Sequence, residues 1–292
     1  MTCPACEGKG VGLVFVDKWQ SGFEKRIHHC HRCRLSFVAP LPSQDELLVL
    51  YDEGYFQSAD GSLGYTDYEP PTMWFAELLR KLRRVKAESP LLDIGTATGE
   101  FLLLAKEHGF EGLGIEPSSW AAEKAQQKGV QVLVGSFEKV APSLSSASFG
   151  GVVMSHVIEH FPDPLGVLKE CARLLRPNGW IAILTPNYAS PRWKDEEKTY
   201  LTSREHLFYF TPLSLRLMVA KAGFTVHHCV SQPCPSPLAW AEVARKEGTF
   251  HWLRFFSKCF TWAYKKWLRS AFQPMRWSDL ILLAQKIEVI AS

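Results

Sequence analysis

The chain has 292 residues, a formal net charge of +3 and the composition of an ordinary globular protein. This length suits one large domain with additions, and a charge so close to zero argues against a general nucleic-acid-binding protein. No uninterrupted apolar stretch is long enough to span a bilayer, and the N-terminus lacks the basic, apolar and small-residue series of a secretory signal. We therefore expect a cytoplasmic protein.

Residues 1–40 have the cysteine spacing of a zinc ribbon. Four of the eight cysteines form two C-x-x-C pairs: Cys3, Cys6, Cys30 and Cys33. In a cytosolic chain, paired C-x-x-C motifs indicate four thiolate ligands of one tetrahedral ion before they indicate disulfides. Two strands, at 11–16 and 23–27, are expected between the pairs. We expect a structural zinc ion, with the ribbon serving as a cap on the fold or as a docking module.

Residues 41–89 connect this ribbon to the rest of the chain. The segment carries aromatic residues, among them Tyr51, Tyr55 and Phe56. It ends in an amphipathic, basic stretch, 73–86, which predicts a helix leading into the next strand.

The stretch 90–101 reads as a strand, a tight glycine turn and the start of a helix. Leu91, Leu92 and Ile94 form the short apolar run of a strand that is buried on both faces. Gly95 and Gly99 bracket small residues, so the backbone can turn sharply and a ligand can approach it closely. A second apolar run, 111–116, ends in an acid about twenty residues after the loop, where a carboxylate can accept hydrogen bonds from a ribose.

These two motifs resemble class I S-adenosylmethionine-dependent methyltransferases, in particular the ubiquinone-methyltransferase-like family. Residues 93–99 (DIGTATG) resemble the first motif of these enzymes, and 114–116 (GIE) the second. The resemblance implies S-adenosylmethionine as cofactor and a lid formed by 41–89, in which Tyr55 touches the methionine end or merely packs. The cofactor-binding residues that it implies are Asp93, Gly95, Thr96, Gly99, Glu116, Ser136, Phe137, Ser155 and Tyr55.

From residue 90 to 230, strand and helix patterns alternate regularly, as a parallel doubly wound sheet requires. Further strands are expected at 130–134, 149–154, 180–184 and 224–230, with a turn at 176–179. An antiparallel strand at 279–286 closes the sheet. The predicted fold is α/β: a seven-stranded, Rossmann-like methyltransferase sheet with an N-terminal zinc ribbon and a helical insertion before the last strand.

Histidines near two strand ends are the candidate catalytic groups. His156 follows the strand 149–154, and His206 lies in a loop that faces the acceptor pocket in the resembled fold. Either histidine can take a proton from an attacking group, and His206 can equally be a structural hydrogen-bonding residue. Some resembling O-methyltransferases hold a divalent metal with E-x-x-E-H at the position of His156-x-x-Glu159-His160; we expect Glu159 and His160 to cap and pack.

The segment 231–292 contains a proline-rich linker, an aromatic and basic stretch, and the closing strand. The stretch 240–277 either packs on protein or makes peripheral contact with a membrane, which would be the inner face for a cytoplasmic protein.

The expected activity is methyl transfer from S-adenosylmethionine to an oxygen, nitrogen or carbon atom of a small metabolite or sugar. One alternative is an RNA methyltransferase whose zinc ribbon binds RNA. Another is a non-catalytic adaptor that binds the cofactor. Few basic residues cluster around the ribbon, which makes nucleic acid the less favoured partner.

Overall fold

The structure is a computed structural model that describes residues 1–18, 24–42, 72–189, 205–232 and 279–287. Tyr55, most of the expected lid, the insertion 233–278 and the membrane-contact stretch 240–277 lie outside these residues, so the predictions about them stay predictions. No helix in the described ranges is long and apolar enough to cross a bilayer.

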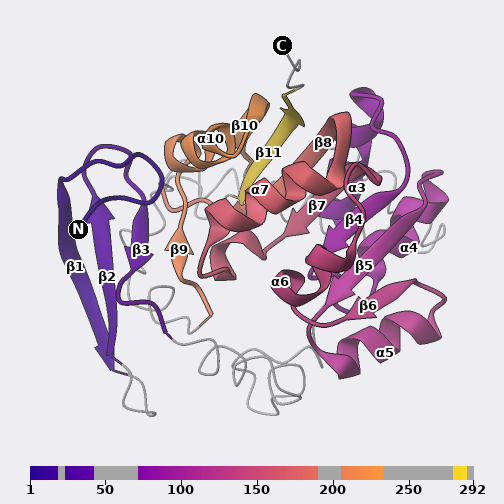
Figure 1. Ribbon diagram of the computed structural model, residues 1–292, viewed down its shortest axis with the longest axis horizontal. Helices are drawn as coiled ribbons and strands as arrows, with labels where there is room; N and C mark the ends of the chain where they lie inside the picture. The colour runs from indigo at the N-terminus through magenta and orange to yellow at the C-terminus, as the bar shows by residue number, and fades with distance from the viewer. Residues whose placement is uncertain (19–23, 43–71, 190–204, 233–278, 288–292) are drawn as a thin grey trace, which may run out of the picture.

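A seven-stranded sheet forms the centre of the molecule, with the order β10-β11-β8-β7-β4-β5-β6 (Figure 1). β11 runs antiparallel to both of its neighbours, whereas β6, β5, β4, β7 and β8 pair in parallel. The order of parallel strands reverses at β4, where ligands of open α/β sheets bind. The strands are β4 (Leu91–Ile94), β5 (Gly112–Glu116), β6 (Val132–Val134), β7 (Phe149–Ser155), β8 (Leu175–Pro186), β10 (Phe224–Gln232) and β11 (Asp279–Lys286).

Helices cover both faces of this sheet, because successive residues of its strands point to opposite faces. Leu92 and Ile183 pack in one apolar cluster with α6, α7 and α10, and Leu91 and Leu184 pack in another with α3, α4 and α5. The expected doubly wound sheet is thus confirmed. The helices are α3 (Thr72–Arg84), α4 (Glu100–Glu107), α5 (Ser119–Gln127), α6 (Phe137–Val140), α7 (Pro164–Leu174) and α10 (Pro212–Lys221), with 3-10 turns η2 (Ala141–Ser143) and η3 (Ile158–His160).

The turn expected at 176–179 lies inside β8 rather than before it. Phe149 of β7 pairs with Leu175, and Gly151 pairs with Trp180. The register thus moves by five residues along β8 while it moves by two along β7. Asn178 has a positive φ of 61° there. The segment therefore bulges out of the ladder, as a turn sequence placed within a strand pair requires.

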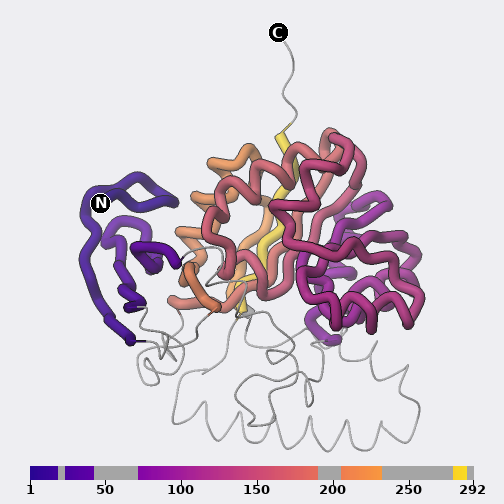
Figure 2. The backbone as a smooth tube through the Cα atoms, turned by 60° about the horizontal axis from the view of Figure 1, so that its bottom comes forward, coloured from indigo at the N-terminus to yellow at the C-terminus, as the bar shows by residue number. Residues whose placement is uncertain are grey.

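A second sheet, of four strands, contains the expected ribbon and one strand that comes from far along the chain. Its order is β1-β2-β3-β9, and every pair is antiparallel. β9 follows β8 in the sequence, and it lies between the ribbon and the rest of the molecule (Figures 1 and 2). The ribbon is therefore joined to the α/β core by a shared sheet. The strands are β1 (Val11–Lys18), β2 (Glu24–Cys30), β3 (Ser36–Val38) and β9 (Phe208–Tyr209).

Candidate functional site

The glycine loop lies between β4 and α4, at the carboxyl end of the sheet. Gly95 and Gly99 have φ values of 72° and 88°, in the left-handed region that side chains disfavour. A Cβ on Gly95 would lie 2.5 Å from Cγ2 of Val157, and one on Gly99 would lie 2.9 Å from Cγ2 of Val130. Both glycines are therefore required by conformation and by packing. Val157, which the sequence does not mark as a site residue, packs directly on the loop.

Glu116, the last residue of β5, holds the loop from the neighbouring strand. Its Oε2 accepts a hydrogen bond from the backbone N–H of Ala97 at 2.9 Å, and its Oε1 accepts one from Ser118 at 2.9 Å. Burial raises the pKa of this carboxyl to about 7, although the two N–H donors oppose that rise. Additional donors, such as the hydroxyls of a ribose, would favour the charged form of a carboxylate in this position.

Asp93 lies under the same loop. Its side chain is 2% exposed, and Oδ2 accepts a hydrogen bond of 2.7 Å from the hydroxyl of Thr96. Burial raises the pKa of Asp93 to about 7; the Thr96 bond lowers it and the charge of Glu116 raises it. Asp93 and Thr96 thus shape the loop from within, and direct contact of either with a cofactor stays a prediction.

The other predicted cofactor residues lie at the ends of β6 and β7. The hydroxyl of Ser136 is buried and makes no hydrogen bond within the described residues, as expected of a group that awaits a ligand. Phe137 is 3% exposed, and its ring packs on Phe161 with centroids 6.2 Å apart. The ring of Phe137 thus belongs to the core, and its contact with a cofactor stays a prediction. Ser155 is half-buried at the end of β7.

Beyond the glycine loop, Glu159, His160 and His206 form a carboxylate–histidine cluster. One ligand atom of each lies within 4.8 Å of the others, and the two imidazole rings stack with centroids 5.1 Å apart. Thr185 donates a 2.9 Å hydrogen bond to Oε2 of Glu159, whereas the buried Oε1 accepts none among the described residues. The structure thus brings together His206 and the two residues that were expected only to cap and pack.

His156, the other candidate catalytic histidine, lies at the rim of this cluster. Its Nδ1 is 3.8 Å from Oε1 of Glu159, and its side chain is 37% exposed. Its φ of 53° turns the chain from β7 into η3. His156 therefore lies close to the cluster without a hydrogen bond to Glu159.

Further groups around the cluster come from β2, from the end of β8 and from the residue that precedes His206. The hydroxyl of Tyr188 lies 2.8 Å from Nδ1 of His206. The ammonium of Lys25, a fully buried residue of β2, lies 5.5 Å from the ring centroid of Tyr209. Burial lowers the pKa of Lys25 to about 8, and the charges of the buried Glu205 and of Asp17 oppose that shift. Tyr188 follows β8 and was detectable as a residue at a strand end; Lys25 had no distinguishing signal.

The electrostatics of this pocket favour neutral imidazoles. Burial lowers the pKa of His160 to about 4, with the charge of Glu205 opposing the shift and those of His156 and Lys25 adding to it. Burial, together with His160, Lys25 and His156, holds the pKa of His206 well below its ordinary value. Burial also raises the pKa of Glu159. Two neutral imidazoles and a buried carboxyl oxygen without a hydrogen-bond partner fit a divalent cation, which needs unprotonated ligands and would favour the charged carboxylate.

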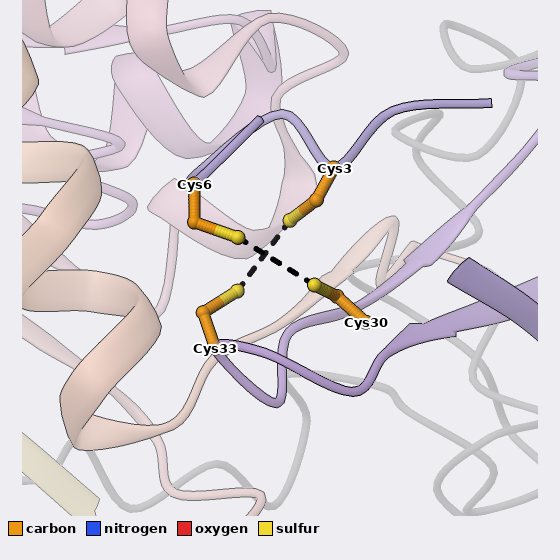
Figure 3. Close-up of side chains that lie close together, drawn as sticks. All are labelled: Cys3, Cys6, Cys30 and Cys33. Carbon is orange, nitrogen blue, oxygen red and sulfur yellow. Dashed lines mark hydrogen bonds between the residues drawn. The ribbon is translucent and has the colours of Figure 1, made fainter. Parts of the chain in front are cut away.

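The four ribbon cysteines converge from two knuckle turns (Figure 3). Sγ of Cys3 is 3.4 Å from that of Cys33, Sγ of Cys6 is 3.5 Å from that of Cys30, and all four lie within 4.8 Å of one another. A disulfide would require about 2.05 Å, whereas zinc–thiolate bonds of about 2.3 Å in a tetrahedron place sulfurs about 3.8 Å apart. The set fits a tetrahedral zinc ion.

Comparisons with known proteins agree with this geometry. Residues 69–229, more than half of the chain, match the family model described as "Methyltransferase domain". The chain is 28% identical over 120 residues to the ubiquinone biosynthesis O-methyltransferase of Leptothrix cholodnii (39% of this chain, 49% of that protein). It is 32% identical over 104 residues to that of Paracidovorax citrulli (33% and 43%). The chain thus spans less than half the length of these relatives.

Two solved structures share the fold. A SAM-dependent methyltransferase of Archaeoglobus fulgidus aligns with a TM-score of 0.54 at 23% identity, covering 80% of this chain and 99% of that one. The 1,6-didemethyltoxoflavin-N1-methyltransferase of Burkholderia thailandensis aligns with a TM-score of 0.56 at 16% identity, covering 94% and 99%. At these identities the likeness shows the fold of the sheet and its helices.

Proposed function

Because this chain belongs to the methyltransferase-domain family, we propose that it transfers the methyl group of S-adenosylmethionine to a hydroxyl oxygen of a small molecule. The observation that carries the proposal is the adjacency of two sites at the carboxyl end of the sheet. Val157 packs on Gly95 of the cofactor loop, and the residues that follow it supply Glu159 and His160.

On the cofactor side, Glu116 accepts the ribose hydroxyls, and the loop bracketed by Gly95 and Gly99 passes beside the methionine end. The buried hydroxyl of Ser136 hydrogen-bonds the adenine. These contacts fix the sulfonium methyl in line with the acceptor and exclude water. Alignment of this kind supplies much of the rate enhancement in a direct displacement.

On the acceptor side, the carboxylate–histidine cluster receives the hydroxyl that is to be methylated. Glu159, His160 and His206 would hold a divalent cation, and such a cation lowers the pKa of a hydroxyl bound to it. Tyr188 fixes the imidazole of His206 through Nδ1, which leaves Nε2 directed to the ligand. Glu159 is oriented in the same way by Thr185.

An oxygen acceptor is favoured over nitrogen or carbon by two observations. Carboxylate and imidazole ligands suit a cation that binds oxygen, and the curated relatives reported above carry the name O-methyltransferase. A small acceptor is favoured over RNA because the net charge is only +3.

The test is a methylation assay with labelled S-adenosylmethionine, with and without Mn²⁺, on four acceptor classes: phenols and catechols, sugars, amines, and short RNA. We expect an ether product from a hydroxyl compound, with a higher rate when Mn²⁺ is present. Transfer of the label only to amines, or only to RNA, would contradict the proposed acceptor. S-adenosylhomocysteine binding without transfer to any acceptor would favour the non-catalytic adaptor.

A further inference from the structure

The loop that carries His206 receives much of its backbone support from the zinc ribbon. β9 begins two residues after His206, and its described ladder is with β3: Ser36 pairs with Tyr209, and Phe37 pairs with Phe208. A two-residue strand has little stability of its own, so its conformation depends on the sheet that it joins.

Leu207 links the ribbon to the carboxylate–histidine cluster through a single residue. Its carbonyl accepts a 2.9 Å hydrogen bond from the N–H of Val38, and its own N–H donates one of 2.9 Å to the carbonyl of Glu159. Its side chain is completely buried. A displacement of β3 would therefore shift the backbone directly after His206 and, through Leu207, the backbone of Glu159.

The metal-binding knuckle itself touches the same segment. The hydroxyl of Thr211, which caps α10, donates a 3.2 Å hydrogen bond to the carbonyl of Cys33. Cys30 and Cys33 belong to one apolar cluster with Leu207 and Phe208. The ring of Phe37 on β3 stacks on that of Phe208, with centroids 6.4 Å apart, so ribbon side chains pack directly on this loop.

The ribbon also places a buried amine against the loop. Nζ of Lys25, on β2, lies 5.5 Å from the ring centroid of Tyr209; burial lowers the pKa of Lys25 to about 8, and the charge of Glu205 opposes that shift. The ring of Tyr209 in turn contacts that of Tyr188 edge to face, with centroids 4.6 Å apart. Tyr188 is the residue that holds His206 through Nδ1.

A ribbon of about forty residues buries too little apolar surface to keep its shape without a bound ion. We propose that the four-cysteine metal centre controls the acceptor site: zinc holds β3 in place, and β3 holds the loop 205–210 and His206. The cofactor loop and Glu116 stand on β4 and β5, and among the described strands neither pairs with a strand of the ribbon. Zinc therefore controls acceptor binding and leaves cofactor binding intact, an inference that rests on the acceptor site proposed above.

The test compares wild type with Cys30→Ser by elemental analysis, hydrogen exchange and calorimetry with S-adenosylhomocysteine. Wild type is expected to carry one zinc per chain and Cys30→Ser none. In the variant, amides of 205–210 should exchange at least about tenfold faster, whereas those of 91–94 and 112–116 stay protected. S-adenosylhomocysteine affinity should stay within about twofold of wild type. Cys171→Ala, which removes a buried thiol of α7 outside the ribbon, should retain zinc and protection in 205–210.

Two results would overturn the inference. Protection of 205–210 that survives the loss of zinc would show that the ribbon does not position the loop. Loss of protection in 91–94 and 112–116 as well would show that zinc supports the whole fold and not the acceptor site. Neither readout needs a methyl acceptor, so a wild-type enzyme that methylates no hydroxyl compound would refute the proposed acceptor chemistry separately.

Discussion

Gly95→Val is expected to weaken S-adenosylhomocysteine binding by at least about a hundredfold. A β-branched residue at a φ of 72° costs about 1–2 kcal/mol, and its Cβ would lie 2.5 Å from Cγ2 of Val157, an overlap that costs about 1–3 kcal/mol to relieve. The loop must leave its conformation, and the hydrogen bond from Ala97 to Glu116 is lost with it. About 2.7 kcal/mol corresponds to a hundredfold change in affinity, which calorimetry measures directly.

Gly109→Val is the matched control for this variant. Gly109 has a φ of 82°, similar to that of Gly95, but nothing lies within 4 Å of a Cβ built there. The control should therefore lose stability through backbone strain and retain ligand affinity. Equal effects of the two substitutions on affinity, or wild-type affinity in Gly95→Val, would contradict the assignment of the loop.

His206→Ala is expected to lower the turnover number by at least about a hundredfold, because it removes one ligand of the carboxylate–histidine cluster. S-adenosylhomocysteine affinity should change by less than about twofold, since His206 lies on the acceptor side. Steady-state kinetics with a hydroxyl acceptor identified by the methylation assay, together with calorimetry, separate the two effects.

His108→Ala is the control for His206→Ala, because His108 follows α4 at the other end of that helix from the glycine loop. It should have wild-type kinetics. A His206→Ala enzyme with turnover close to wild type would remove His206 from the reaction. A parallel loss of S-adenosylhomocysteine affinity would show that the substitution disturbs the cofactor site instead.

The sheet and the cofactor loop could be predicted because their signals are local. The run Leu91–Ile94 is apolar except for Asp93, the glycines stand where the backbone needs a positive φ, and Glu116 is the last residue of the next strand. The closing strand could also be found, since 280–284 is a continuous apolar run. Each of these inferences uses residues close together in the sequence.

The join between the ribbon and the acceptor site could not be predicted in the same way. β9 has two residues, too few to show a period, and its partner β3 lies about 170 residues away in the sequence. Lys25 reads as an exposed residue of a ribbon strand, and its burial follows from Tyr209 and Glu205 lying above it. The carboxylate–histidine cluster likewise depends on the tertiary approach of His206 to η3.

The central claim is that S-adenosylmethionine binds at the glycine loop with its ribose on Glu116. Calorimetric titration of wild type and Glu116→Ala with S-adenosylhomocysteine and with NAD tests this claim most directly. Hydrogen bonds from hydroxyls to a shielded carboxylate contribute roughly 1.5–3 kcal/mol each, so Glu116→Ala should bind S-adenosylhomocysteine at least about tenfold more weakly. Glu123→Ala, on the exposed face of α5, should bind like wild type, and NAD should not compete. Tight binding of NAD with no response to S-adenosylhomocysteine would contradict the claim, and equal affinity in wild type and Glu116→Ala would remove Glu116 from the site.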